Sequence, residues 1–210
     1  MLGYASFPPE QDKILFAIVG PNGVGKTTFY RHFLRQLGWP YVNADALARA
    51  FWDDHLAEET GREDRDRAAA RMTDLIRDQM LEGELARLAP RFVIETVFSH
   101  PSKIEYLQRA RDAGYFVQLF VIGTDSIELL QARVVIRRAE GEHGVPPEKV
   151  SSRYERVFEH VGAALKIVDR AWLLDNSGSP FEPVVRIEGD AQAHLRPGHP
   201  QPQWVKRMLG

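Results

Sequence analysis

The chain has 210 residues, a formal net charge of −2 at pH 7, 44% hydrophobic and 27% charged residues, and no cysteine. This length and composition indicate one globular α/β domain, and the charge argues against a membrane or nucleic-acid partner. Without cysteine there is no disulfide, thiolate metal site or cysteine nucleophile. Residues 1–12 show no signal-peptide pattern and no apolar run is long enough to span a bilayer, so we expect a cytoplasmic protein.

A phosphate-binding pattern lies near the start of the chain. Residues 14–19 are an unbroken apolar run, the next eight fit G-x-x-x-x-G-K-[ST], and apolar side chains then recur at helical spacing up to Gly38. This context predicts a P-loop, in which Lys26 reaches the β- and γ-phosphates and the Thr27 hydroxyl ligates Mg²⁺. The residues expected to bind the nucleotide are Gly20, Pro21, Asn22, Gly23, Val24, Gly25, Lys26, Thr27 and Thr28.

The rest of the chain alternates strand-like and helix-like patterns. Further strands are expected at 39–43, 92–94, 115–122, 171–174 and, as a sixth, 184–187. Helices are expected at 46–52, 67–84, 101–113, 148–166 and 204–209, with another that Thr124 or Asp125 caps and that runs to about Arg138. Residues 53–66 read as a solvated loop or a frayed helix.

The alternation of strands and helices predicts an α/β fold: a P-loop NTPase three-layer sandwich with a mainly parallel five- or six-stranded sheet. We expect residues 1–189 to form this P-loop domain, with a helical lid at about 133–156. Residues 190–210 are expected to form a tail packed on the domain.

Polar residues follow several of the predicted strands. Because ligands of an open parallel sheet bind beyond the carboxyl ends of its strands, these residues should face one crevice. Asp45 is the candidate general base for an acceptor hydroxyl, although its position also suits a helix N-cap. Glu95 could hold Mg²⁺ or bind the acceptor, Asp175 competes for the metal role, and either could be only a strand-end cap. The set comprises the P-loop, Asp45, Glu95, Thr96, Asp125, Asp175 and Asn176.

Arginines gather around a turn rich in glycine and proline at residues 139–147. Arg133, Arg137 and Arg138 precede the turn, and Arg153 and Arg156 follow it. Such a cluster is typical of a mobile lid that neutralises a transferring phosphoryl group and excludes water. Taken singly, each arginine is more readily explained as a solvated surface residue.

Together these motifs resemble the zeta-toxin-like family of P-loop kinases, in particular its stand-alone bacterial branch. The resemblance covers residues 13–177. Its order of N-x-D, E-T and R-Y motifs is more specific than the P-loop alone. The matching stretches are residues 20–28, Asn43-Ala44-Asp45, residues 94–99, Arg137-Arg138, residues 144–146, Arg153-Tyr154 and residues 175–177.

The resemblance implies an adenylate-kinase-like fold, ATP as donor and Mg²⁺ as cofactor. It implies transfer of the γ-phosphate to a hydroxyl of a small molecule, as zeta toxins phosphorylate UDP-N-acetylglucosamine, and it implies an antitoxin as a partner. The stand-alone branch need not share the toxins' substrate. The implied site consists of Lys26 and Thr27 on the phosphates and Mg²⁺, Asp45 as base, Glu95 and Thr96 at the acceptor, Arg138 and Arg153 on the γ-phosphate, and Asn176 at the adenine.

Two other readings stay open at this point. A polynucleotide or nucleoside kinase would share the P-loop and the lid arginines. An ATP-binding module that switches a partner would use a surface such as residues 204–209, which a tail helix packed on the body explains more simply.

Overall fold

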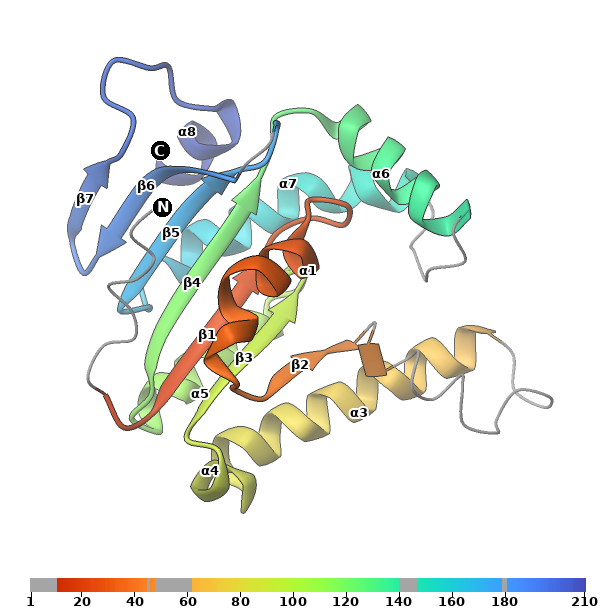
Figure 1. The fold of residues 1–210 in the computed structure, drawn as a ribbon, viewed down its shortest axis with the longest axis vertical. Coiled ribbons are helices and arrows are strands. Elements are labelled where there is room, and N and C mark those ends of the chain that lie inside the picture. Colours follow the sequence, from red (N-terminus) through yellow and green to blue (C-terminus); the bar gives the residue numbers. More distant parts are fainter. Residues whose placement is uncertain (1–10, 45, 48–61, 140–146, 179–180) are drawn as a thin grey trace.

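The computed structural model of the chain describes residues 11–44, 46–47, 62–139, 147–178 and 181–210. These residues contain one seven-stranded sheet in the order β2-β3-β1-β4-β5-β6-β7 (Figure 1). The strands from β2 to β5 pair in parallel, whereas β6 and β7 are antiparallel to their neighbours. The strands are β1 (Ile14–Val19), β2 (Tyr41–Asn43), β3 (Arg91–Thr96), β4 (Phe116–Gly123), β5 (Arg170–Asp175), β6 (Glu182–Glu188) and β7 (Ala191–His194).

Helices lie on both faces of the sheet, with α1 in front and α5 and α7 behind in Figure 1. The segment after the P-loop begins as α1 (Lys26–Phe29), continues as a π-helical turn (Tyr30–Leu34) and a 3₁₀ turn (Arg35–Leu37), and ends at the predicted Gly38. The other helices are α3 (Arg62–Glu82), α4 (Leu85–Leu88), α5 (Ser102–Asp112), α6 (Ile127–Ala139), α7 (Pro147–Ala164) and α8 (Gln203–Leu209). The predicted three-layer α/β fold of the P-loop NTPase type is therefore confirmed.

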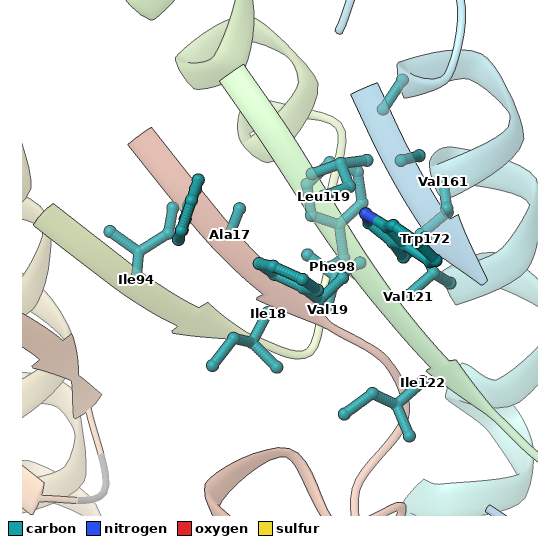
Figure 2. Packing of buried hydrophobic residues seen from close by; sticks show 14 of the residues in the cluster. Ala17, Ile18, Val19, Ile94, Phe98, Leu119, Val121, Ile122, Val161 and Trp172 are labelled. Atoms are coloured by element: carbon teal, nitrogen blue, oxygen red, sulfur yellow. The ribbon is translucent and has the colours of Figure 1, made fainter. Parts of the chain in front are cut away.

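The central strand β1 is fully buried at all six positions. A parallel strand covered on both faces has no solvent side, so it carries an unbroken apolar run instead of an alternating one. Figure 2 shows Ala17, Ile18 and Val19 of β1 packed among side chains of the neighbouring strands and of α7, including Val161. The P-loop therefore starts from the end of a strand that is buried along its whole length.

The sheet has seven strands, whereas the sequence predicted five or six. The additional strand, β7, forms an antiparallel edge pair with β6 inside the segment predicted to be a tail. All four of its side chains are exposed, so no apolar alternation marks it in the sequence. Its backbone pairing with β6, rather than its side chains, explains its conformation.

The C-terminal helix α8 packs on the ends of β4 and β5. Its Trp204 is fully buried, with its ring centroid 5.2 Å from that of Phe158 on α7. Gly123 at the end of β4 makes room for the indole, because a Cβ at that position would lie 2.5 Å from the ring.

Three predicted segments lie largely outside the described residues. They are the helix at 46–52, the turn at 139–147, and the loop or frayed helix at 53–66, of which only residues 62–66 are described, as the start of α3. The helices α6 and α7 that flank the predicted turn are described, and they contact each other.

Candidate functional site

A cleft of about 710 Å³ opens at the carboxyl ends of β1 and β3. The P-loop lines one side through Asn22, Gly23 and the residues from Gly25 to Thr28. Glu95 and Thr96 from the end of β3 line the cleft beside it, as the strand-end rule predicts. Within the P-loop, Gly20, Pro21 and Val24 do not line the cleft and instead shape the loop.

The P-loop places Lys26 at the floor of the cleft. Gly25 precedes α1 in the left-handed conformation, with φ of 94°. The Lys26 side chain is only 7% exposed, and its Nζ donates to the carbonyl oxygens of Gly20 and Pro21, 3.0 Å from each. The ammonium is thus held inside the ring of backbone that a P-loop uses to bind phosphate.

Thr27 of the P-loop and Glu95 of β3 are in direct contact in the wall of the cleft. The Thr27 hydroxyl donates to the Glu95 carboxylate, with Oγ1 3.1 Å from both Oε1 and Oε2. Tyr41 on β2 also donates its hydroxyl to Glu95 Oε2. Burial, together with the charge of Glu95, raises the pKa of Tyr41 well above its ordinary value, so the hydroxyl keeps its proton at neutral pH.

The pair of Thr27 and Glu95 fits Mg²⁺ by its donor chemistry. Mg²⁺ prefers hard oxygen ligands, and nucleotide-dependent proteins hold it with one or two protein groups together with the phosphates. A hydroxyl and a carboxylate in direct contact beside Lys26 supply such a pair. Among the described residues there is no group of three or more His, Asp or Glu side chains placed to hold a metal ion by themselves. A metal at Thr27 and Glu95 would therefore also need the phosphates as ligands.

Asn176 directly follows β5, lines the cleft, and connects the end of β5 with the P-loop through a hydrogen bond. Asn176 Nδ2 donates to the carbonyl oxygen of Val24 at 2.8 Å. Arg133 on α6 lines the cleft and donates through Nη1 to the Asn176 carbonyl oxygen at 3.2 Å. Burial lowers the pKa of Arg133 from its ordinary value, which records the desolvation of this guanidinium.

Asp125 and Asp175 do not face the cleft, contrary to the strand-end prediction. Asp125 accepts from the backbone N–H groups of Gln203 and Trp204 at 2.8 and 2.7 Å, so it caps α8 and not the helix that follows it. The cap of α6 is Ser126, whose Oγ accepts from the Leu129 N–H at 3.1 Å. Asp175 Oδ1 accepts from the indole N–H of Trp204 at 3.1 Å. Both carboxylates therefore accept hydrogen bonds from residues of α8. Sequence patterns could not reveal these contacts, because the partners lie far apart in the chain.

The other predicted site residues are placed as follows. Asp45 and the side chain of Arg138 lie outside the described part of the chain, although the neighbouring Asn43 and Ala44 line the cleft. Arg133 and Arg137 line the cleft, whereas the half-buried Arg153 does not. Of the arginines predicted to form the lid, the two on α6 whose side chains are described therefore reach the candidate site.

The far side of the cleft contains Arg77 and Lys103, which were not predicted. Arg77 on α3 is 5% exposed, and its Nη2 donates to the carbonyl oxygen of Glu95 at 2.8 Å. Asp74 pairs with both cations, with Oδ1 3.2 Å from Arg77 Nη1 and 3.0 Å from Lys103 Nζ. Burial lowers the pKa of Arg77, and the nearby Asp74 opposes that effect. One signal was available: Arg77 follows Thr73 and precedes Met80 at helical spacing, and an arginine on a buried helix face needs a specific partner.

The cleft is cationic although the whole chain is slightly acidic. Six cationic and two acidic side chains are among its described lining residues. A concave site with one dominant sign of charge concentrates ligands of the opposite sign. The cations are Lys26, Arg31, Arg77, Lys103, Arg133 and Arg137, and the acids are Asp74 and Glu95.

Two curated proteins are similar to this chain in sequence. A protein of Pyrococcus abyssi, provisionally named an adenylate kinase, is 26% identical over 190 residues, which cover 84% of this chain and 100% of that protein. An uncharacterized protein of Haemophilus influenzae is 28% identical over 148 residues, which cover 69% of this chain and 94% of that protein.

Solved structures also resemble the chain. The AvrRxo1-ORF1:-ORF2 complex with ATP aligns with a TM-score of 0.70 and 18% identity, covering 89% of this chain and 61% of that chain. The chain thus spans about three fifths of the AvrRxo1 chain that it matches. The PezAT toxin-antitoxin system of Streptococcus pneumoniae aligns with a TM-score of 0.59 and 18% identity, covering 87% of this chain and 76% of that chain. At these identities the likeness is one of fold.

The sequence profile of the AAA_33 family, described as an AAA domain, matches residues 15–161, well over half of the chain. The matched stretch includes the P-loop, Glu95 and the helix α6. The chain therefore belongs to the AAA_33 family of AAA domains and has the P-loop kinase-like fold of that family.

Proposed function

We propose that the protein is an ATP-dependent kinase that transfers the γ-phosphate of ATP to a hydroxyl group of a small anionic molecule, such as a UDP-N-acetyl sugar. The observation that carries the proposal is the meeting of Lys26, Thr27 and Glu95 in one cationic cleft. The provisional naming of the Pyrococcus abyssi relative as an adenylate kinase and the ATP in the AvrRxo1 complex support the same class of reaction.

The donor side of the proposed site is the P-loop. Its backbone N–H groups and Lys26 would hold the β- and γ-phosphates, and Thr27 with Glu95 would hold Mg²⁺. Bound Mg²⁺ would offset the negative charge of the phosphates. We propose that Arg133 and Arg137 act as lid cations at the γ-phosphate, with Arg138 a further candidate and Arg153 a weaker one because it does not line the cleft. Asn176 would border the adenine.

The acceptor side is proposed to lie toward Asn43, Thr96 and Lys103. In the transfer, the acceptor oxygen bonds to the γ-phosphorus while the bond from phosphorus to the β,γ-bridging oxygen breaks and ADP leaves. The acceptor proton passes to Asp45, which the resemblance to zeta toxins makes the base. An anionic acceptor suits the excess of cations in the cleft, and Glu95 and Thr96 would line its binding site.

We further propose that the protein acts in the cytoplasm, where ATP is available. In the described part of the chain no helix is both long enough and apolar enough to cross a membrane. Since the PezAT neighbour is a toxin-antitoxin system, a cognate antitoxin is the partner to search for.

The test is a transfer screen with labelled ATP against UDP-sugars, nucleosides and single-stranded oligonucleotides, with Lys26→Ala as the blank. Label on a UDP-sugar would support the proposal, and label only on oligonucleotides would favour a polynucleotide kinase. ATP hydrolysis with no labelled acceptor would favour a nucleotide-driven switch.

Asp45→Asn tests the assignment of the base. General-base catalysis contributes about 10²- to 10⁴-fold, so transfer should fall by that factor while the Kd for ATP stays within about 2-fold. Asp190→Asn, at an exposed position between β6 and β7, is the matched control. Transfer by Asp45→Asn at a rate near that of the wild type would refute the assignment.

A further inference from the structure

A chain of hydrogen bonds connects the P-loop with the segment that follows β2. Thr27 and Tyr41 both donate to the Glu95 carboxylate. Asn43 Nδ2 donates to the Tyr41 hydroxyl oxygen at 2.8 Å, and Asn43 Oδ1 accepts from the Ala46 N–H at 3.4 Å. These links join α1, β3, β2 and the backbone on either side of residue 45. The carboxylate of Glu95 is therefore oriented from β2 as well as from the P-loop.

The ring of Tyr41 is held independently of its hydroxyl. It stacks on Tyr30, which directly follows α1, with ring centroids 3.6 Å apart and planes inclined by 6°. The stack fixes where the phenolic oxygen points, and that oxygen meets the carboxylate of Glu95. A Glu side chain has three rotatable bonds, so a fixed second donor narrows the directions in which its oxygens can point.

We propose that Tyr41 is a positioning residue that holds the Glu95 carboxylate in the orientation needed to bind Mg²⁺ together with Thr27. Partners of this kind, which orient a metal ligand without touching the metal, are a general device of metal sites. The inference rests on the proposed function, because it assumes that Thr27 and Glu95 hold Mg²⁺. It also gives a role to Asn43 of the N-x-D motif, which donates to the Tyr41 hydroxyl oxygen.

The experiment uses a pair of variants that differ only in which hydroxyl of the stacked rings is removed. Tyr41→Phe keeps the ring on Tyr30 but loses the donor to Glu95. Tyr30→Phe keeps the same stack and leaves Glu95 with its Tyr41 donor. The full chain is titrated with a fluorescent ATP analogue in EDTA and over a range of Mg²⁺ concentrations. Binding of Mn²⁺ to the nucleotide complex is followed by electron paramagnetic resonance, and thermal unfolding checks that each variant is folded.

Tyr41→Phe should raise the Mg²⁺ concentration for half-maximal nucleotide binding, and the Kd of Mn²⁺, by about 10- to 100-fold. Its nucleotide affinity in EDTA should match that of the wild type, since Lys26 and the P-loop backbone are unchanged. Tyr30→Phe should stay within about 2-fold of the wild type in both measurements. Equal effects of Tyr41→Phe and Tyr30→Phe would overturn the proposal.

Glu95→Gln gives a second test through a double-mutant cycle. If Tyr41 acts through Glu95, adding Tyr41→Phe to Glu95→Gln should change metal binding by less than about 2-fold further. Effects that multiply in the double variant would show that Tyr41 acts by another route and would overturn the inference. Failure of the assumed metal site is distinguishable, because the wild type itself would then show no dependence of nucleotide binding on Mg²⁺. Failure of the proposed transfer is read separately, from the labelled-ATP screen.

Discussion

Replacement of Gly25 by alanine tests the geometry of the P-loop most directly. Gly25 has φ of 94° and ψ of 21°, in the left-handed region that side chains with a Cβ disfavour. A Cβ at this position would lie 2.6 Å from Asn176 Nδ2 and 3.4 Å from the ring of Phe181. The substitution therefore strains the backbone and displaces the buried amide that holds the loop to β5.

The expected cost follows from these two effects. The left-handed conformation costs a residue with a Cβ about 1–2 kcal/mol. Displacing Asn176 removes its hydrogen bond to the Val24 carbonyl oxygen, worth about 0.5–1.5 kcal/mol. Gly25→Ala should then destabilise the fold by about 2–3 kcal/mol, which lowers the Tm of a chain of this size by about 4–12 °C.

Two other glycines separate the contributions. Gly38 has φ of 66°, and a Cβ added there would meet nothing within 4 Å, so Gly38→Ala should show the conformational cost alone, about 1–2 kcal/mol. Gly178 lines the same cleft, also has open space around it, and does not have a positive φ, so Gly178→Ala should change stability by less than about 0.5 kcal/mol.

Urea unfolding gives the three stabilities, and isothermal titration gives the affinity for ATP. Gly25→Ala should weaken ATP binding at least tenfold, because the loop must shift away from Asn176, whereas Gly38→Ala should bind ATP like the wild type. The reasoning is refuted if Gly25→Ala is no less stable than Gly178→Ala, or if it binds ATP with unchanged affinity.

Two further predictions concern stability. Asp125→Ala should cost about 0.5–2 kcal/mol in urea unfolding, because it removes the carboxylate that caps α8, and an unchanged midpoint would contradict that role. Glu188→Gln should weaken the fold at neutral pH by less than about 1 kcal/mol, since the pair is partly exposed. The hydrogen bond from Arg170 lowers the pKa of Glu188 below 4.5, so this contribution is complete above pH 4.5 and disappears as the pH falls through the lower folded value. Wild type and Glu188→Gln should therefore differ in stability at pH 7 and converge in acid, and a constant difference across that range would contradict the assignment.

The architecture could be predicted from the sequence because its strongest signals are local. The apolar run of β1, the P-loop pattern and the glycine at residue 38 each determine a conformation within a few residues of themselves. The ends of β3 and β5 were also placed closely, because charged or polar residues follow apolar runs there. These local signals predict that Glu95 ends a strand, and the parallel pairing of β3 with β1 places it beside the P-loop.

The unpredicted parts of the site depend on contacts between distant segments. Lys103 on α5 reaches the cleft only because α5 follows β3 and lies near α3, and the sequence of α5 gives no sign of this. Asp125 carries the usual features of a cap for the next helix, yet it caps a helix 78 residues further on. The helix-capping propensity of aspartate describes which hydrogen bonds its side chain can accept from nearby backbone. In this fold the packing of α8 places the N–H groups of Gln203 and Trp204 next to Asp125 instead.

The position of α8 explains why the strand-end rule succeeded for Glu95 and failed for Asp175. Both residues end parallel strands that point toward the same edge of the sheet. The edge beyond β4 and β5 is occupied by the buried indole of Trp204, whereas the edge beyond β1 and β3 stays open to the cleft. Asp175 lies next to α8, and its carboxylate accepts from the indole N–H of Trp204 and from the backbone N–H and hydroxyl of Ser177. Glu95 lies at the open part, where its partners are the P-loop hydroxyl and Tyr41. The packing of α8 therefore leaves Glu95, rather than Asp175, as the strand-end carboxylate able to contact a metal held by Thr27.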